Sequence, residues 1–183
     1  ISLVKAVQLI LWEGPFYHLW YLPAAITGGI IVYWLRKHFS IKTVLAITAG
    51  LYIIGLFGDS YYGLIADTPV GYYIYQPLFA VFSTTRNGLF LAPLFMAAGC
   101  VFSRMKREPR RGLCLTLLII SSLSMAAEAL TLRALQWQRH DSMYFCLIPT
   151  MLFLFTLLYY IPAKPRPFCR RLSTWVYLLH PLA

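Results

Sequence analysis

Long apolar stretches separated by short, mostly basic connections are the feature that most constrains this sequence. Hydrophobic residues fill 60% of the 183 positions and charged residues only 12%, whereas soluble domains are nearer 45–50% and about 25%. A water-soluble fold of this length cannot bury so much apolar surface, so lipid is the expected solvent. Because an open chain in lipid satisfies its backbone groups only as helices, the sequence predicts an all-α, polytopic transmembrane helix bundle.

The apolar runs predict about six spans, by the length that a helix needs to cross a bilayer. Five of them cover residues 19–35, 41–57, 87–102, 113–135 and 144–161, and a sixth, truncated by the end of the chain, begins at Leu172. Residues 1–12 would rise only about 18 Å as a helix. We therefore expect them to be the tail of a span or a helix in the membrane interface.

The basic residues predict which ends of the spans face the cytoplasm, because cytoplasmic loops collect Lys and Arg. Twelve of the sixteen basic residues lie in the connections 36–42, 104–111 and 164–171, with Glu108 as their one acid. The rest of the chain has four basic and five acidic residues. Counting the apolar segment 70–85 as a further span would destroy this asymmetry. We therefore predict that residues 70–85 form a re-entrant or interfacial segment on the outer side.

The net charge of +10 does not indicate a nucleic-acid-binding protein, because the basic residues form no continuous face that could follow phosphates. The cysteines have no CxxC spacing, so no metal site is expected. Membrane lipid is the expected surrounding partner.

Glu128 is the one carboxylate deep inside an apolar run. A charge at the centre of a span costs about 2.5–3.5 kcal/mol on insertion scales, so such a residue is a functional candidate. A raised pKa would suit it to proton transfer. The structural alternative is an ion pair inside the bundle, with Arg86 or a residue of another helix as the partner.

Several further polar residues lie at or near the predicted outer face. Arg86 and Asn87 open the third predicted span, where an arginine suits the helix dipole poorly. An anion is therefore expected nearby: Asp59, Glu128 or a substrate. The alternative is an arginine whose charged end reaches the interface. His18 and His180 are both imidazoles beside aromatic residues, and an interfacial role is the alternative for each.

Three segments carry a resemblance to a known family: residues 17–22 (YHLWYL), 85–95 (TRNGLFLAPLF) and 177–181 (YLLHP). They resemble successive motifs of the acyltransferase-3 family, multi-spanning bacterial membrane proteins that move acyl groups, commonly acetyl, onto sugars and other cell-envelope hydroxyls. Residues 54–63 (IGLFGDSYYG) resemble more narrowly the membrane domain of the membrane-bound serine racemases of vancomycin resistance.

The resemblance implies that residues 1–183 are one fragment of an acyltransferase-3-like membrane domain. We expect the N-terminal helices of that domain, with its main catalytic histidine, to precede Ile1, and any soluble C-terminal domain to follow Ala183. As a fragment, the chain is expected to be inactive by itself.

The full protein would sit in the bacterial cytoplasmic membrane as a multi-pass O-acyltransferase. Acyl-CoA, commonly acetyl-CoA, would be the donor, and a small molecule or envelope glycan the acceptor. His18 and Glu128 are the predicted catalytic residues, whereas Arg86, Asn87, Asp59 and His180 are predicted to bind the substrate. The alternative is an L-serine transport or anchoring domain of a membrane-bound racemase, with Arg86, Asp59 and Glu128 binding an amino acid.

Overall fold

A computed structural model of the chain describes residues 20–105 and 110–160, together with 168–169, 172–173 and 175–176. The described residues form helices and turns, without a strand among them. The elements are α2 (Tyr21–His38), α3 (Ile41–Phe57), the short turns η3 (Tyr62–Leu64) and η4 (Gly71–Tyr75), α4 (Gln76–Val81), α5 (Ala92–Phe102), α6 (Arg111–Ala134) and α7 (Leu147–Tyr159). The all-α prediction is therefore confirmed for the described part of the chain.

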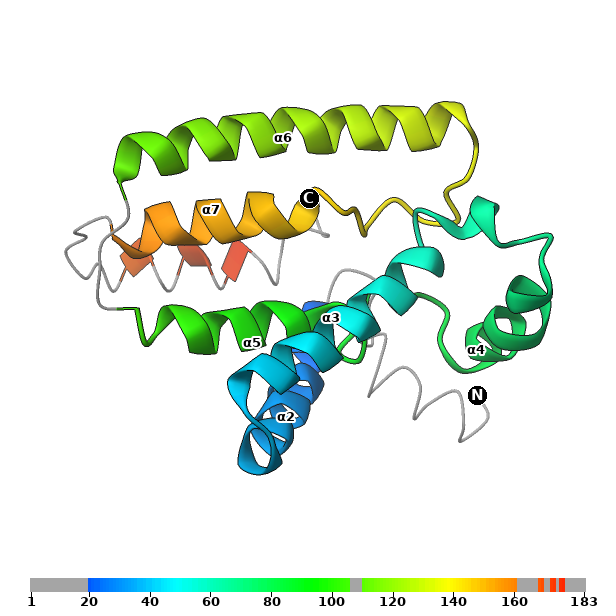
Figure 1. Cartoon of the computed structure of the whole chain (residues 1–183), viewed down its shortest axis with the longest axis horizontal. Coiled ribbons are helices and arrows are strands. Elements are labelled where there is room, and N and C mark those ends of the chain that lie inside the picture. Colours follow the sequence, from blue (N-terminus) through cyan, green and yellow to red (C-terminus); the bar gives the residue numbers. More distant parts are fainter. Residues whose placement is uncertain (1–19, 106–109, 161–167, 170–171, 174, 177–183) are drawn as a thin grey trace.

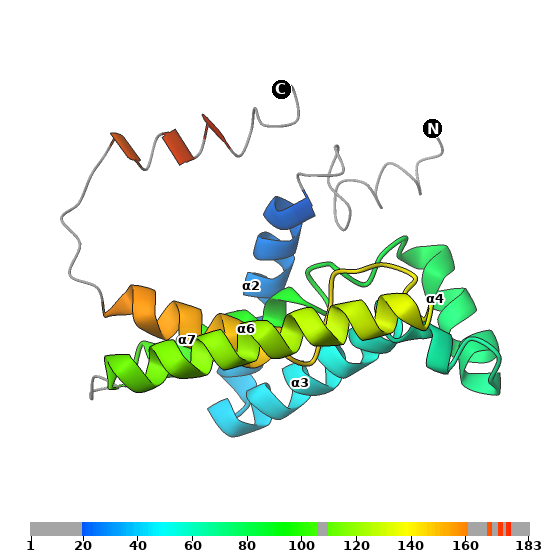
Figure 2. The same ribbon diagram turned by 90° about the horizontal axis from the view of Figure 1, so that it is seen from above.

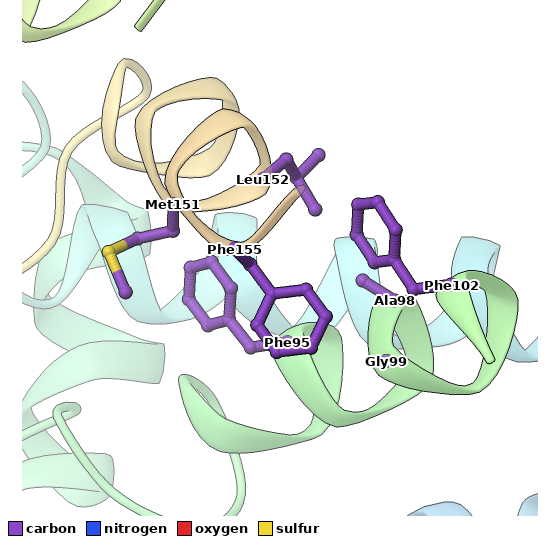
Figure 3. A pocket seen from close by; sticks show the side chains of 7 residues that line it. All are labelled: Phe95, Ala98, Gly99, Phe102, Met151, Leu152 and Phe155. Atoms are coloured by element: carbon purple, nitrogen blue, oxygen red, sulfur yellow. The ribbon is translucent and has the colours of Figure 1, made fainter. Parts of the chain in front are cut away.

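The helices form two packed groups that meet at α5 (Figures 1 and 2). Helices α6 and α7 run antiparallel and side by side, joined by the connection 135–146. Helices α2 and α3 both pack against α5. The contact between α5 and α7 is apolar and leaves a cavity of about 110 Å³. Figure 3 shows that its lining carries no polar side chain, so this cavity supplies no chemistry.

Two of the predicted spans begin later than the hydropathy pattern indicates. The third begins at Ala92 instead of residue 87, because residues 87–91 form a turn that the Asn87 side chain stabilises. The fifth begins at Leu147 instead of residue 144, because two backbone N–H groups just before it donate to Glu128. Span 41–57 matches α3, whose first turn is capped by the Ser40 hydroxyl.

Among the described residues, only α6 has the length and the hydropathy that a membrane-spanning helix needs. Helices α3, α5 and α7 are apolar but shorter. Residues 71–81 form a five-residue π turn followed by a six-residue helix. This stretch is no shorter than α5, which was predicted to span, so the prediction that segment 70–85 is not a full span stays a prediction. Its position relative to lipid stays a prediction, as does a six-span bundle. The predicted segment 1–12 lies outside the described residues, and the predicted sixth span does so in large part.

The basic ends of α2 and α5 lie beside each other, and the basic start of α6 lies beside the end of α7. Arg36 of α2 and Arg104 after α5 line the same groove. At the start of α6, Arg111 Nη2 donates to the Tyr160 carbonyl just after α7, at 3.1 Å. The connection between α6 and α7 and the η3–α4 segment lie together at the opposite end (Figure 1). The prediction that these basic ends share one side of a membrane stays a prediction.

Glycines allow α2 to approach the turn before α5 closely. A Cβ atom on Gly28 would lie 2.8 Å from Ala92 Cβ, and one on Gly88 would overlap the Thr27 side chain. Helix α2 and the turn before α5 are therefore tightly packed at both glycines. Because Gly88 follows Arg86 and Asn87 directly, this contact fixes the polar turn against the first described helix.

We predict that Gly28→Val lowers the free energy of unfolding by about 1–3 kcal/mol, because the added methyl groups overfill a packed contact. Gly50→Val is the matched control, since a Cβ at this helical glycine meets nothing within 4 Å. Unfolding of the full-length protein in detergent–SDS mixtures measures both. Equal losses in the two variants would contradict the tight packing.

Candidate functional site

Asp59 lies directly after α3 and is fully buried. Its Oδ1 atom accepts hydrogen bonds from the Ser142 N–H at 2.8 Å, the Met143 N–H at 3.0 Å and the Ser60 hydroxyl at 2.9 Å. The Asp59 carbonyl also accepts from the Arg139 N–H at 3.1 Å. Its Oδ2 atom is buried without a hydrogen-bond partner. One oxygen therefore anchors the α6–α7 connection, and the other is left as an unused acceptor.

Burial raises the pKa of the Asp59 carboxyl above its ordinary value, against the lowering effect of the hydrogen bonds from Ser142, Ser60 and Met143. The nearby His140 imidazole also lowers the Asp59 pKa, as the smallest of these effects. Desolvation dominates because the unpartnered oxygen loses its hydration and receives no donor in exchange. Asp59 is thus poised to take up a proton or a positively charged group.

Arg86 also contacts the connection between α6 and α7. Its Nη1 atom donates to Ser142 Oγ at 3.3 Å, and its guanidinium carbon lies 4.7 Å from the centre of the Trp20 ring. Ser142 therefore touches both Asp59, through its N–H, and Arg86, through its hydroxyl. We call Trp20, Asp59, Arg86 and Ser142 the outer cluster, after the side of the membrane that the sequence predicts for them. It combines a half-buried cation, a buried carboxylate and an aromatic face.

Hydrogen bonds to the C-terminal end of α3 position the segment that carries Arg86. The Thr85 hydroxyl donates to the Gly55 carbonyl at 2.7 Å, and the Tyr75 hydroxyl donates to the Ile54 carbonyl at 2.9 Å. These carbonyls belong to the last turn of α3 and also accept from the Gly58 N–H, so each side-chain hydroxyl is a second donor to its carbonyl. Thr85 is fully buried, so the backbone that leads into Arg86 is fixed by the same turn that precedes Asp59.

Asn87 is almost completely buried and uses both ends of its side-chain amide within the chain. Its Oδ1 accepts from the N–H groups of Leu89 and Phe90, at 2.9 and 3.1 Å, and its Nδ2 donates to the Thr84 carbonyl at 2.9 Å. These bonds build the turn before α5. A role for Asn87 in substrate binding stays a prediction, and its observed contacts are those of a turn residue.

Glu128, in the last third of α6, holds the start of α7. Its Oε1 accepts from the Phe145 N–H at 2.7 Å and from the Tyr61 hydroxyl at 2.6 Å, and its Oε2 accepts from the Cys146 N–H at 2.8 Å. These partners, rather than Arg86, satisfy the carboxylate. A negative charge at a helix N-terminus is also favoured by the helix dipole.

Burial, followed by the hydrogen bond to Glu128, raises the pKa of Tyr61. The tyrosine therefore stays protonated and donates to the carboxylate. Glu128 consequently has both oxygens engaged, and a direct catalytic role for it stays a prediction.

Three contributors to the site could not be identified from the sequence. Ser142 and His140 lie in a polar connection without a motif, and Tyr61 was assigned no role of its own. No local signal identifies them, because their roles depend on which segments α3 and α6 bring together. The predicted residues His18 and His180 lie outside the described part of the chain. Within that part, no three His, Cys, Asp or Glu side chains are grouped as metal ligands would be.

We predict that Asp59→Asn removes a pH dependence of stability. The raised pKa of Asp59 means that the unfolded chain loses this proton at a lower pH than the folded protein does. The folded protein should therefore lose stability as the pH rises from about 4 through the folded pKa. Asparagine keeps an acceptor for the three donors and cannot ionise.

Unfolding in detergent–SDS mixtures across this pH range measures the difference between the wild type and Asp59→Asn. Asp141→Asn, at an exposed position of the same connection, is the control that should keep the wild-type slope. Parallel pH profiles for the wild type and Asp59→Asn would contradict the burial argument.

We predict that Glu128→Gln lowers the free energy of unfolding by about 1–2 kcal/mol, because an amide offers one acceptor oxygen in place of two at a helix N-terminus. Tyr61→Phe should cost less, about 0.5–1.5 kcal/mol. The double variant should lose less than the sum, since the two groups share a bond.

Ser124→Ala, exposed on the same helix, is the control for the Glu128 series. A Glu128→Gln protein with unchanged stability and no activity would refute the capping role and favour direct catalysis.

Comparisons with known proteins agree with the resemblance in the sequence motifs. The family model Acyl_transf_3, described as an acyltransferase domain, matches residues 2–183. A serine/alanine racemase of Enterococcus gallinarum is 42% identical over 178 residues, which cover 96% of this chain and 25% of the racemase. An amino-acid racemase of Enterococcus faecalis is 37% identical over 171 residues, 93% of this chain and 24% of that protein.

The chain therefore spans about a quarter of the length of these curated relatives. No solved structure matches the chain. Since the family model covers nearly every residue, the chain belongs to the acyltransferase-3 family of acyltransferase domains.

Proposed function

We propose that this domain works as part of a multi-pass membrane O-acyltransferase in the bacterial cytoplasmic membrane, with its basic end in the cytoplasm. The surface of α6 supports a lipid environment. This helix buries Cys114, Ser121 and Leu132, whereas large apolar side chains such as Leu123 and Leu130 are 67% and 69% exposed. Large exposed apolar side chains promote aggregation in water, whereas a helix in a bilayer is expected to expose them to lipid and to bury small residues.

The proposed reaction transfers an acyl group, commonly acetyl, from acyl-CoA to a hydroxyl of an envelope acceptor. The bond between the hydroxyl oxygen and the acyl carbon forms, the thioester C–S bond breaks, and the hydroxyl proton ends on the coenzyme A sulfur. The basic end of the bundle suits the phosphates of the donor, and the outer cluster suits a polar acceptor.

The single observation that carries the proposal is the outer cluster, in which Arg86 and Asp59 reach the same residue, Ser142. The guanidinium of Arg86 can donate to an acceptor oxygen or to the oxyanion that forms during transfer. The Asp59 Oδ2 is buried without a hydrogen-bond partner, and we propose that it accepts from an acceptor hydroxyl once the connection 135–146 moves aside. His18 is proposed as a base because it precedes Trp20 by two residues in the sequence. His180 is retained as a substrate-binding candidate.

A second candidate function is recognition of an amino acid for a racemase, as the names of the relatives suggest. In this case Arg86 would bind the carboxylate and Asp59 the ammonium group of L-serine. The outer cluster has one group of each sign, as a zwitterion requires. The two candidates use the same residues and differ in whether an acyl-CoA is consumed.

The test uses the full-length protein in proteoliposomes with labelled acetyl-CoA on the basic side, run in parallel with uptake of labelled L-serine. We predict acetyl transfer to an acceptor hydroxyl and a loss of about 100-fold or more in Arg86→Gln, the cost of removing one oxyanion donor. Arg133→Gln, an exposed arginine of α6, is the matched control and should keep the wild-type rate.

Two results would overturn this proposal. Serine uptake that depends on Arg86, without acetyl transfer, would favour the second candidate. Wild-type acetyl transfer by Arg86→Gln would remove the outer cluster from the reaction.

A further inference from the structure

A groove of about 460 Å³ lies between α2 and α5, at the basic end of the bundle. Its apolar part is formed mainly by Gly29, Val32 and Tyr33 of α2 and by Met96 and Cys100 of α5. Its mouth carries two cations, Arg36 and Arg104, together with Ser103. The groove is distinct from the outer cluster, which lies beyond the opposite end of α3.

The groove is apolar along its length and cationic at one end. From Gly29 to Arg36 the α2 backbone rises about 10 Å, enough to receive the upper part of one hydrocarbon chain. Neither α2 nor α5 has an acidic residue that could neutralise the two arginines. Arg36 Nη1 donates to the Phe39 carbonyl at 3.1 Å, which holds this side chain at the end of α2.

Aromatic residues indicate that the arginines lie at headgroup depth. Trp34, one residue before the last buried position of α2, is 56% exposed, and its ring lies 4.9 Å from the His38 ring. Tyr33, which lines the groove, is 75% exposed. Exposed Trp and Tyr at the end of a membrane helix are typical of the interface between hydrocarbon and water. Because its lining residue Tyr33 is exposed, the groove is open along the side of α2.

We propose that this groove binds one anionic phospholipid of the cytoplasmic leaflet, with its phosphate between Arg36 and Arg104 and the start of one acyl chain against Met96 and Cys100. The proposal rests on the membrane placement proposed above. Charge complementarity selects an anionic headgroup, because basic pockets between membrane helices on the cytoplasmic side suit such lipids. The opening along the side of α2 selects a lipid over a soluble phosphate compound.

The test uses the full-length protein in nanodiscs that contain phosphatidylglycerol with a photoreactive group on one acyl chain. We expect cross-links on α2 and α5 peptides that contain Tyr33, Met96 or Cys100. Excess unlabelled phosphatidylglycerol should remove them, whereas excess phosphatidylcholine should not. In the double variant Arg36→Gln, Arg104→Gln, half-maximal cross-linking should need about thirtyfold more labelled lipid, because each basic side chain near an anionic headgroup contributes about fivefold.

Two further variants control this experiment. Lys37→Gln combined with Lys42→Gln removes the same charge from exposed positions outside the groove lining and should keep wild-type cross-linking. Gly29→Leu leaves both arginines and fills the groove, where a Cβ atom at this position already lies 3.8 Å from Met96 Sδ. It should therefore reduce cross-linking, whereas Gly50→Leu should not.

Several outcomes would overturn the proposal: cross-links that map elsewhere, equal competition by phosphatidylcholine, equal loss in the Lys37/Lys42 variant, or displacement by inorganic phosphate or free coenzyme A. Extraction of membranes at alkaline pH tests the proposed membrane placement separately from the proposed lipid site. Protein that stays in the membrane but shows no arginine-dependent preference refutes the lipid site alone. Protein released by alkali refutes both.

Discussion

The connection between α6 and α7 is held by two carboxylates, each of which accepts from two consecutive backbone N–H groups. Asp59 binds the amides of Ser142 and Met143, and Glu128 binds those of Phe145 and Cys146. Hydrogen bonds to charged acceptors are roughly twice as strong as neutral ones. The two acids come from different helical segments, so the connection ties the end of α3 to the α6–α7 pair.

The connection between α6 and α7 determines where the candidate site lies. Its Ser142 hydroxyl is directed to Arg86, and the Tyr144 carbonyl accepts from the Tyr52 hydroxyl of α3 at 2.7 Å. The polar groups thus meet beyond the C-terminal end of α3, whereas Arg36 and Arg104 line a groove near its start. The proposed reaction would bind the acceptor at the polar cluster and the donor at the basic helix ends.

The sequence predicted the features that depend on composition and local pattern. The apolar run 41–57 matches α3 because Ser40 caps its start and Gly58 follows its end. The charge asymmetry indicated which helix ends lie together, and Arg36 and Arg104 do line one groove. Arg86 was identified because an arginine at the start of a span suits the helix dipole poorly, and Asp59 was identified as one possible anion near it.

The partners of these residues could not be predicted. Glu128 was expected to have an ion pair as its structural alternative, but its acceptors are occupied by the Tyr61 hydroxyl and two backbone amides. Backbone N–H groups at the start of a helix are common to nearly all residues, so no side-chain pattern in the sequence identifies them as partners. The late start of α5 has a similar cause, since the hydropathy of residues 87–91 does not reveal that Asn87 folds them into a turn.

The central claim is that the outer cluster and the basic helix ends lie on opposite sides of a membrane. The most direct measurement is thiol labelling of the full-length protein in intact cells, after the native cysteines have been replaced. Single cysteines are introduced at Asp141, exposed beside the outer cluster, and at Lys37, exposed at the basic end. We predict that a membrane-impermeant maleimide labels position 141 in intact cells and position 37 only after the cells are opened. Labelling of both positions from the same side would contradict the account.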